Sequence, residues 1–150
     1  MTLPAPARSM VGGCHHTPLE EQAMDPMKTH GAFSWSELMT PHPQAAADFY
    51  HQLFGWTVQT MQMPGGPYHL VKVGDTSVAG IMSLPADAPH MPPAWGCYVT
   101  VDNADETAGE CEALGGKVLV KPTDIPGVGR FAVLQDPQGA VISVIDYIDE

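Results

Sequence analysis

The sequence has few basic residues. Only 6 lysines and arginines stand against 17 aspartates and glutamates among 150 residues, which gives a formal net charge of −11 and a pI near 4.8. Such a charge repels phosphate backbones and anionic membrane surfaces. We therefore expect neither nucleic acid nor a membrane as a partner, and we expect a neutral or cationic ligand instead.

Cysteine is scarce as well. The chain has three cysteines, an odd number without the density of a disulfide scaffold, which fits reduced thiols in the cytoplasm. The first thirty residues contain no apolar run of signal-peptide or membrane-spanning length. Because 150 residues with 44% hydrophobic content support one good core, we expect a single cytoplasmic domain.

Residues 1–30 differ from the rest, because they are rich in proline and glycine and lack periodicity. We interpret them as a disordered or extended arm, with Met24 or Met27 as alternative starts, and place the folded domain at 31–150. Cys14, His15 and His16 could bind a metal in principle. However, adjacent residues of an extended chain cannot all face one ion, and no fourth ligand follows at a suitable spacing.

What the sequence does have is an internal repeat. The segments 33–84 and 95–147 each show the pattern of a strand, a helix that ends at glycine, and three further strands. Equivalent residues lie 61 positions apart: Trp35 and Gly96, Thr40 and Val101, Ala47 and Ala108, Leu53 and Leu114, Gly55 and Gly116. Two such units predict an α+β fold in which two tandem βαβββ units form a cupped mixed sheet with helices on its outer face.

Alternation assigns faces in the first strand, residues 33–40. It places Trp35, Glu37 and Met39 on one face, and Ser34, Ser36 and Leu38 on the other. The next helix carries an apolar stripe that should cover the sheet, formed by Ala46, Phe49, Tyr50 and Leu53. In the second unit, Asp102 or Asn103 should cap a helix whose stripe consists of Ala104, Ala108, Cys111 and Leu114.

Several motifs carry a family resemblance. They are Asp48-Phe49-Tyr50, Leu53-Phe54-Gly55-Trp56, Val101-Asp102-Asn103, and Asp136-Pro137-Gln138-Gly139 before the last strand. With the duplicated unit, they resemble the vicinal oxygen chelate superfamily over residues 33–147, and within it the glyoxalase-like branch. That superfamily includes glyoxalase I, extradiol dioxygenases and bleomycin-binding resistance proteins. The resemblance also implies a homodimer.

Enzymes of that superfamily place His or Glu metal ligands at four positions in the cup. By the resemblance, these positions fall here on Trp35, Gly96, Ser143 and a residue within 78–80. None offers a side chain of the kind that holds a divalent ion. We therefore predict no metal and no other cofactor, with a divalent metal as the alternative.

The predicted cup nevertheless carries polar and aromatic groups. Trp35 and Tyr98 offer flat area for a ligand, and Glu37 brings a carboxylate to the same face. His69 could act as a base or be an ordinary strand residue. The predicted ligand-binding set is Trp35, Glu37, His69, Tyr98, Thr100, Arg130 and Ser143. Alternatively, Trp35 plugs the cup and Arg130 pairs with Glu37 as a structural contact.

Three functional hypotheses follow. The first is metal-independent binding of a small cationic or aromatic molecule. The second is a lyase, isomerase or dioxygenase that uses a divalent metal, and so an enzyme of the glyoxalase kind. The third is a cup filled by its own side chains that serves as a dimer or partner module. The sequence leaves open whether any reaction is catalysed.

Overall fold

The computed structural model describes residues 23–63, 65–86 and 90–148. The first unit contains β1 (Phe33–Thr40), α1 (Pro43–Phe54), β2 (Thr57–Met63), β3 (Gly66–Val73) and β4 (Thr76–Ser83). The second contains β5 (Ala94–Thr100), α2 (Ala104–Ala113), β6 (Lys117–Ile125), β7 (Gly129–Gln135) and β8 (Val141–Tyr147). A short 3-10 helix, η1 (Pro26–Lys28), precedes β1.

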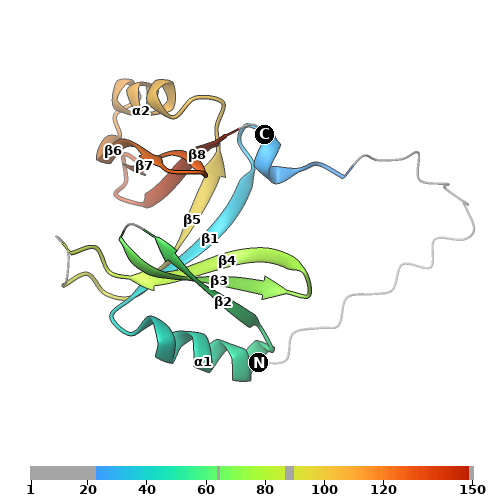
Figure 1. The fold of residues 1–150 in the computed structure, drawn as a ribbon. Helices are drawn as coiled ribbons and strands as arrows, with labels where there is room; N and C mark the ends of the chain where they lie inside the picture. Colours follow the sequence, from blue (N-terminus) through green and yellow to red (C-terminus); the bar gives the residue numbers. More distant parts are fainter. Residues whose placement is uncertain (1–22, 64, 87–89, 149–150) are drawn as a thin grey trace, which may run out of the picture.

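The strands form one sheet in the order β2-β3-β4-β1-β5-β8-β7-β6. The pairs β1–β4 and β5–β8 are parallel and the other pairs are antiparallel. The sheet curls, with α1 outside the half formed by β2–β4 and α2 outside the half formed by β6–β8 (Figure 1). The predicted α+β fold of two tandem βαβββ units is confirmed.

The two units meet where β1 pairs with β5. Ser36 lies opposite Cys97, and these two residues are 61 positions apart in the sequence. A local twofold axis therefore passes between them, as the constant offset of the repeat requires. The same axis relates Glu37 to Tyr98, which puts one polar residue of each unit close to the axis.

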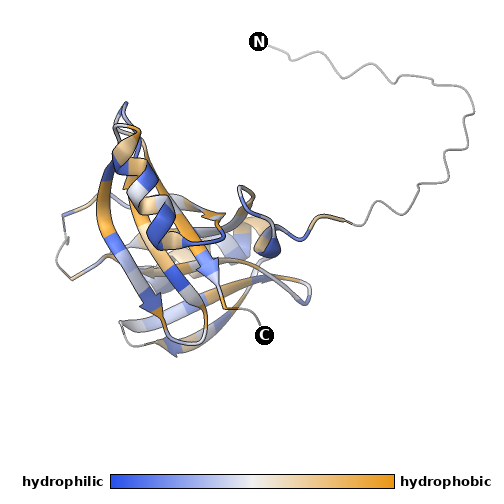
Figure 2. Ribbon diagram, turned by 90° about the horizontal axis from the view of Figure 1, so that it is seen from above, coloured by the Kyte–Doolittle hydropathy of each residue, from blue (hydrophilic) through white to orange (hydrophobic). Residues whose placement is uncertain are grey.

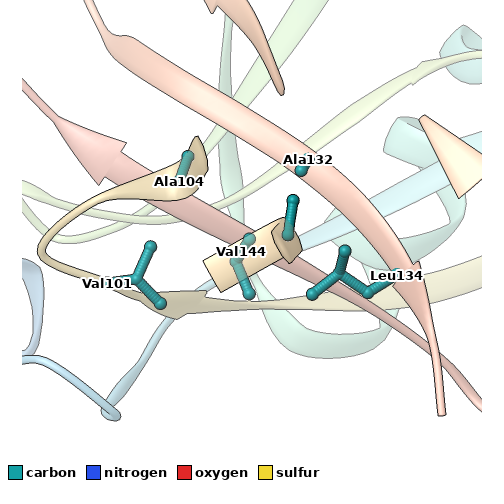
Figure 3. Close-up of a cluster of buried hydrophobic side chains, with 6 residues drawn as sticks. Val101, Ala104, Ala132, Leu134 and Val144 are labelled. Carbon is teal, nitrogen blue, oxygen red and sulfur yellow. The ribbon is translucent and has the colours of Figure 1, made fainter. Parts of the chain in front are cut away.

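Each unit has its own hydrophobic core between helix and sheet. In the second unit, α2 packs on β7 and β8 (Figure 3), and the buried residues are Val101, Ala104, Ala108, Ala132, Leu134 and Val144. In the first unit they are Leu38, Ala47, Val71, Ala79 and Ile81. Viewed from above, α2 carries hydrophilic stretches and the strands beneath it carry hydrophobic ones (Figure 2). Residues that alternate with these core positions therefore face the inside of the cup.

The predicted helix stripes are only partly right. In α1, Ala47 is buried and Ala46 and Tyr50 pack on the core, but Phe49 and Leu53 are 58% and 56% exposed. The helix turns its small alanines to the sheet, which leaves the two larger side chains on its flank. Leu114 of the second stripe is also exposed, because it lies at the C-cap of α2 beyond the last covered turn. Asn103 is the N-cap, and its side chain accepts a hydrogen bond from the Glu106 N–H.

The end of the predicted arm is folded onto the domain. The Thr100 hydroxyl donates to the Pro26 carbonyl at 2.7 Å, and the Gly31 N–H donates to the Thr100 carbonyl. The Asp102 N–H donates to His30 Nδ1 at 3.0 Å. Residues 1–22, with Cys14, His15 and His16, lie outside the described residues. Within the described part of the chain, no helix has the length and apolar character to cross a membrane.

Candidate functional site

Glu37 lies at the centre of the cup floor. On β1 it is flanked in register by Gly80 of β4 and Gly96 of β5. Trp35 lies next to Tyr98, which in turn pairs with Ser143 of β8. Two glycines beside one carboxylate leave room above the sheet for large side chains to approach it.

Two tyrosine hydroxyls occupy that room. Tyr68 donates to Glu37 Oε2 at 2.8 Å, and Tyr98 donates to Oε1 at 2.9 Å. The indole N–H of Trp35 donates to the Tyr68 hydroxyl at 2.9 Å. Because the indole can only donate, it leaves the Tyr68 proton free to point at the carboxylate. We call Trp35, Glu37, Tyr68 and Tyr98 the floor network.

Burial controls the ionisation of this network. Glu37 is 8% exposed and Tyr98 7%. Loss of hydration raises the pKa of Glu37, and the hydrogen bonds from Tyr68 and Tyr98 partly oppose that rise. Burial, and next the nearby charge of Glu37, raise the pKa of both tyrosines. The tyrosines therefore stay protonated and act as donors.

Gly80 makes the position of Tyr68 possible. A Cβ at position 80 would overlap the hydroxyl and ring of Tyr68. Residue 80 lies in the segment 78–80 that the family resemblance matches to a metal-ligand position. The Tyr68 hydroxyl, supplied from β3, thus fills space that a side chain from β4 would otherwise take.

A β-bulge adds a second polar pair. The pairing of β1 with β5 shifts between Phe33 and Trp35, so Ser34 is the extra residue. Its hydroxyl lies 2.8 Å from that of Tyr147 on β8. Alternation alone predicts Ser34 on the face opposite Trp35, and that prediction is wrong because the bulge re-aims the side chain. Burial raises the pKa of Tyr147, and the hydrogen bond with Ser34 opposes the rise.

Arg130 lies away from the floor network. On β7 it has the same parity as the buried Ala132 and Leu134, so it faces the α2 side of the sheet. Its guanidinium bonds Asp105 of α2 at 2.8 and 3.0 Å and Asp124 at 3.0 Å. The hypothesis that Arg130 pairs with Glu37 is therefore wrong. The two aspartates raise the pKa of the guanidinium through hydrogen bonds and charge, while Arg130 lowers the pKa of Asp105.

His69 and Thr100 are also outside the floor network. His69 has the parity of Val71, which places it on the α1 side of β3, and its Nδ1 lies 3.0 Å from the Thr60 hydroxyl. It is buried and faces away from its neighbour Tyr68. Thr100 is on the cup side but is covered by η1 through its bond to Pro26. Ser143 is half-buried beside Tyr98 and remains near the network.

The residue types do not fit a metal centre. Among the described residues, no three His, Cys, Asp or Glu side chains converge as a possible metal site. The positions matched by the resemblance are Trp35, Gly96, Ser143 and a residue within 78–80, and none carries a carboxylate or imidazole. The carboxylate beside them, that of Glu37, already accepts two tyrosine hydroxyls. One such group does not supply the three or four ligands that a protein-held divalent ion needs.

Two hollows lie along the seam of β1 with β4 and β5. They measure about 270 and 370 Å³ and share Ser36, Val78 and Cys97. The first is also lined by Ser34 and Trp35, so it borders the floor network, whereas the second is lined by Trp56 and Trp95 of the α1 side. Their lining residues include no ionisable group except the Cys97 thiol. We therefore place the candidate site in the cup, where the ionisable and hydrogen-bonding groups converge.

Sequence reasoning missed Tyr68, Tyr147 and Ser34. A signal for Tyr68 exists, since a glycine inside a strand, here Gly80, often marks the close approach of another group. The bulge that turns Ser34 has no such signal, because no glycine or proline marks it.

Comparisons with known proteins agree with this fold. Residues 32–144 match the model of the Glyoxalase/Bleomycin resistance protein/Dioxygenase superfamily. The chain is 46% identical over 116 residues to "Putative glyoxylase CFP32" of Mycobacterium bovis, which covers 77% of this chain and 44% of that protein. It is 36% identical over 127 residues to "Anthracycline biosynthesis protein DnrV" of Streptomyces peucetius, covering 76% and 46%. The chain thus spans about half the length of the curated relatives it matches.

Solved structures show the same architecture. Methylmalonyl-CoA epimerase from Mycobacterium tuberculosis superposes with a TM-score of 0.57 at 14% identity, covering 79% of this chain and 89% of that one. The Streptomyces coelicolor epimerase gives 0.59 at 15% identity, covering 81% and 100%. At these identities the likeness establishes the fold alone. With a family model that matches most of its length, the chain belongs to the Glyoxalase/Bleomycin resistance protein/Dioxygenase superfamily.

Proposed function

We propose that this protein binds a small molecule in the cup without a metal ion. The observation that carries the proposal is the floor network itself. Tyr68 and Tyr98 bond both carboxylate oxygens of Glu37, and Tyr68 lies over Gly80, in the region where family enzymes place metal ligands. A site built this way offers hydrogen bonds and aromatic surface in place of coordination.

The ligand would lie on the half-buried members of the cup. Trp35 and Tyr68 are partly exposed above the carboxylate, and Ser143 and Tyr147 are partly exposed on the β8 side. Their rings and hydroxyls can stack on and orient a ligand that displaces water from the cup.

The test is ligand binding in the presence of a chelator. A thermal-shift screen of small molecules on the full chain identifies a binder, and calorimetry then measures its affinity before and after EDTA. We expect unchanged affinity after EDTA and a loss of about tenfold in Trp35→Ala, because an aromatic contact contributes about 0.5–1.5 kcal/mol beyond the area that it buries.

Trp95→Ala is the matched control. Trp95 lies in the aromatic cluster with Tyr50 and Trp56 on the α1 side of the sheet, so its removal should leave affinity unchanged. Equal losses in the two variants would contradict binding in the cup. Affinity that disappears with EDTA would favour the metal-dependent enzyme. A screen without any binder would favour the self-filled cup.

A further inference from the structure

Within the described part of the chain, the carboxylate of Glu37 has no cationic partner. His30 pairs with Asp102, and Arg130 pairs with Asp105 and Asp124, so these two cationic side chains are engaged away from Glu37. The groups that bond Glu37 are neutral hydroxyls. A buried carboxylate without a counter-ion favours an incoming positive charge, because the desolvation of the anion has already taken place on folding.

One wall of the cup is made of methionines. Met39 of β1 and Met82 of β4 are partners in register, and Met61 of β2 pairs with Tyr68. Each alternates with a residue of the α1-side core, as Met39 does with Leu38 and Met82 with Ile81, so these methionines face the cup. Met39 and Met82 are partly exposed and Met61 is 40% exposed. Thioether side chains adapt in shape and make favourable contacts with aromatic rings.

The facing wall is aromatic and aliphatic. Phe131 and Val133 of β7 alternate with the buried Ala132 and Leu134, so they face the cup, and both are partly exposed. Tyr147 adds a ring beyond them on β8. The cup therefore carries apolar side chains from both halves of the sheet and the negative group of Glu37 between them. Lys72 of β3 and Gln59 of β2 also have the cup-side parity of Tyr68 and Met61.

We propose that the ligand is an aromatic compound that carries a protonated amine, with its ring between the methionine wall and Phe131 and its ammonium group directed at Glu37. This inference rests on the proposed function, because it identifies the ligand class of the same cup. The ammonium donates hydrogen bonds to the lone pairs of Glu37 and of the tyrosine hydroxyls that the floor network leaves free.

Three probes that share one ring test it. Calorimetry of the full chain with naphthylmethylamine, naphthalenemethanol and naphthylacetate compares a cation, a neutral alcohol and an anion. We expect the amine to bind about tenfold tighter than the alcohol and the anion not to bind, because a hydrogen bond to a charged group contributes about tenfold or more.

Two glutamine variants test whether the amine interacts with the charge of Glu37. Glu37→Gln should reduce the affinity of the amine by about tenfold while leaving that of the alcohol unchanged. Glu110→Gln, at an exposed site on α2, is the matched control and should change neither. Circular dichroism of Glu37→Gln checks that the variant is folded, and Tyr98→Phe, which also alters the floor network, should weaken the amine selectively if Glu37→Gln does not fold.

The outcomes separate this inference from the proposed function. Equal affinity for amine and alcohol, or an amine affinity that Glu37→Gln leaves unchanged, would overturn the ammonium assignment while binding in the cup still holds. Failure of all three probes to bind would overturn the ligand class, and the chelator experiment with its screened binder would then decide the proposed function separately.

Discussion

Substitution of Gly80 is the sharpest structural perturbation of the floor network. In Gly80→Ala, the new methyl group would overlap the Tyr68 ring, with Cε1 only 2.6 Å away and the hydroxyl closer still. The ring has to move, because the β4 backbone is held between β1 and β3. Movement of the ring separates Tyr68 from Glu37 and from Trp35.

The cost follows from two contributions. Overpacking a buried site costs about 1–3 kcal/mol, and loss of the hydrogen bond to the Glu37 carboxyl costs about 1.5–3 kcal/mol. We therefore expect Gly80→Ala to lower the free energy of unfolding by about 3–5 kcal/mol. For a chain of this size, that corresponds to a fall in Tm of roughly 10 °C or more.

Urea denaturation followed by circular dichroism measures this cost. The matched control is Gly109→Ala in α2, where a Cβ meets nothing within 4 Å and where alanine should stabilise the helix by about 0.5–1 kcal/mol. The double variant Gly80→Ala/Tyr68→Ala should be more stable than the sum of the single variants predicts, because removal of the ring removes the clash. Additive effects, or a Gly80→Ala cost under about 1 kcal/mol, would contradict a clash between the new methyl group and the Tyr68 ring.

The remaining predictions concern charge and capping. Because burial raises the pKa of Glu37 above its ordinary value of 4.5, its contribution to stability is fully present below that pH and is lost as pH rises through the raised pKa. Urea unfolding of the wild type and of Glu37→Gln measures this effect. The free energy of unfolding of the wild type, relative to that of Glu37→Gln, should fall as pH rises through this range. A difference that does not change with pH would contradict this expectation. Arg130→Gln should leave ligand affinity unchanged in calorimetry, since Arg130 lies on the α2 side of the sheet, and a tenfold loss would disprove that placement. Asn103→Ala should lower the free energy of unfolding by about 1 kcal/mol through loss of the N-cap, with no change in ligand affinity.

The repeat could be predicted from the sequence because both units keep the same periodicity. The 61-residue offset identifies equivalent residues, and the structure places Ser36 opposite Cys97 at the axis that this offset implies. Alternation along β1 likewise places Glu37 and Trp35 on the face that also carries Tyr98. These features depend on local pattern, which a single sequence contains.

The parts that could not be predicted depend on contacts between distant strands. The sequence predicted His69 in the cup, but its neighbour Tyr68 lies there instead. Which of the two faces the cup is set by the pairing of β3 with β2 and β4. The face of Arg130 is likewise set by α2 packing over β7. The burial of α1 depends on how the helix rotates on the sheet, and hydrophobicity alone does not distinguish the buried Ala47 from the exposed Leu53.

We propose that a carboxylate held by two tyrosines stands in place of a metal centre. Calorimetric titration of the metal-stripped full chain with Zn²⁺ and Mn²⁺, in the wild type and in Glu37→Gln, measures whether this carboxylate binds an ion. We predict no stoichiometric uptake that depends on Glu37. Tight binding of one ion per chain that is lost in Glu37→Gln would contradict the claim.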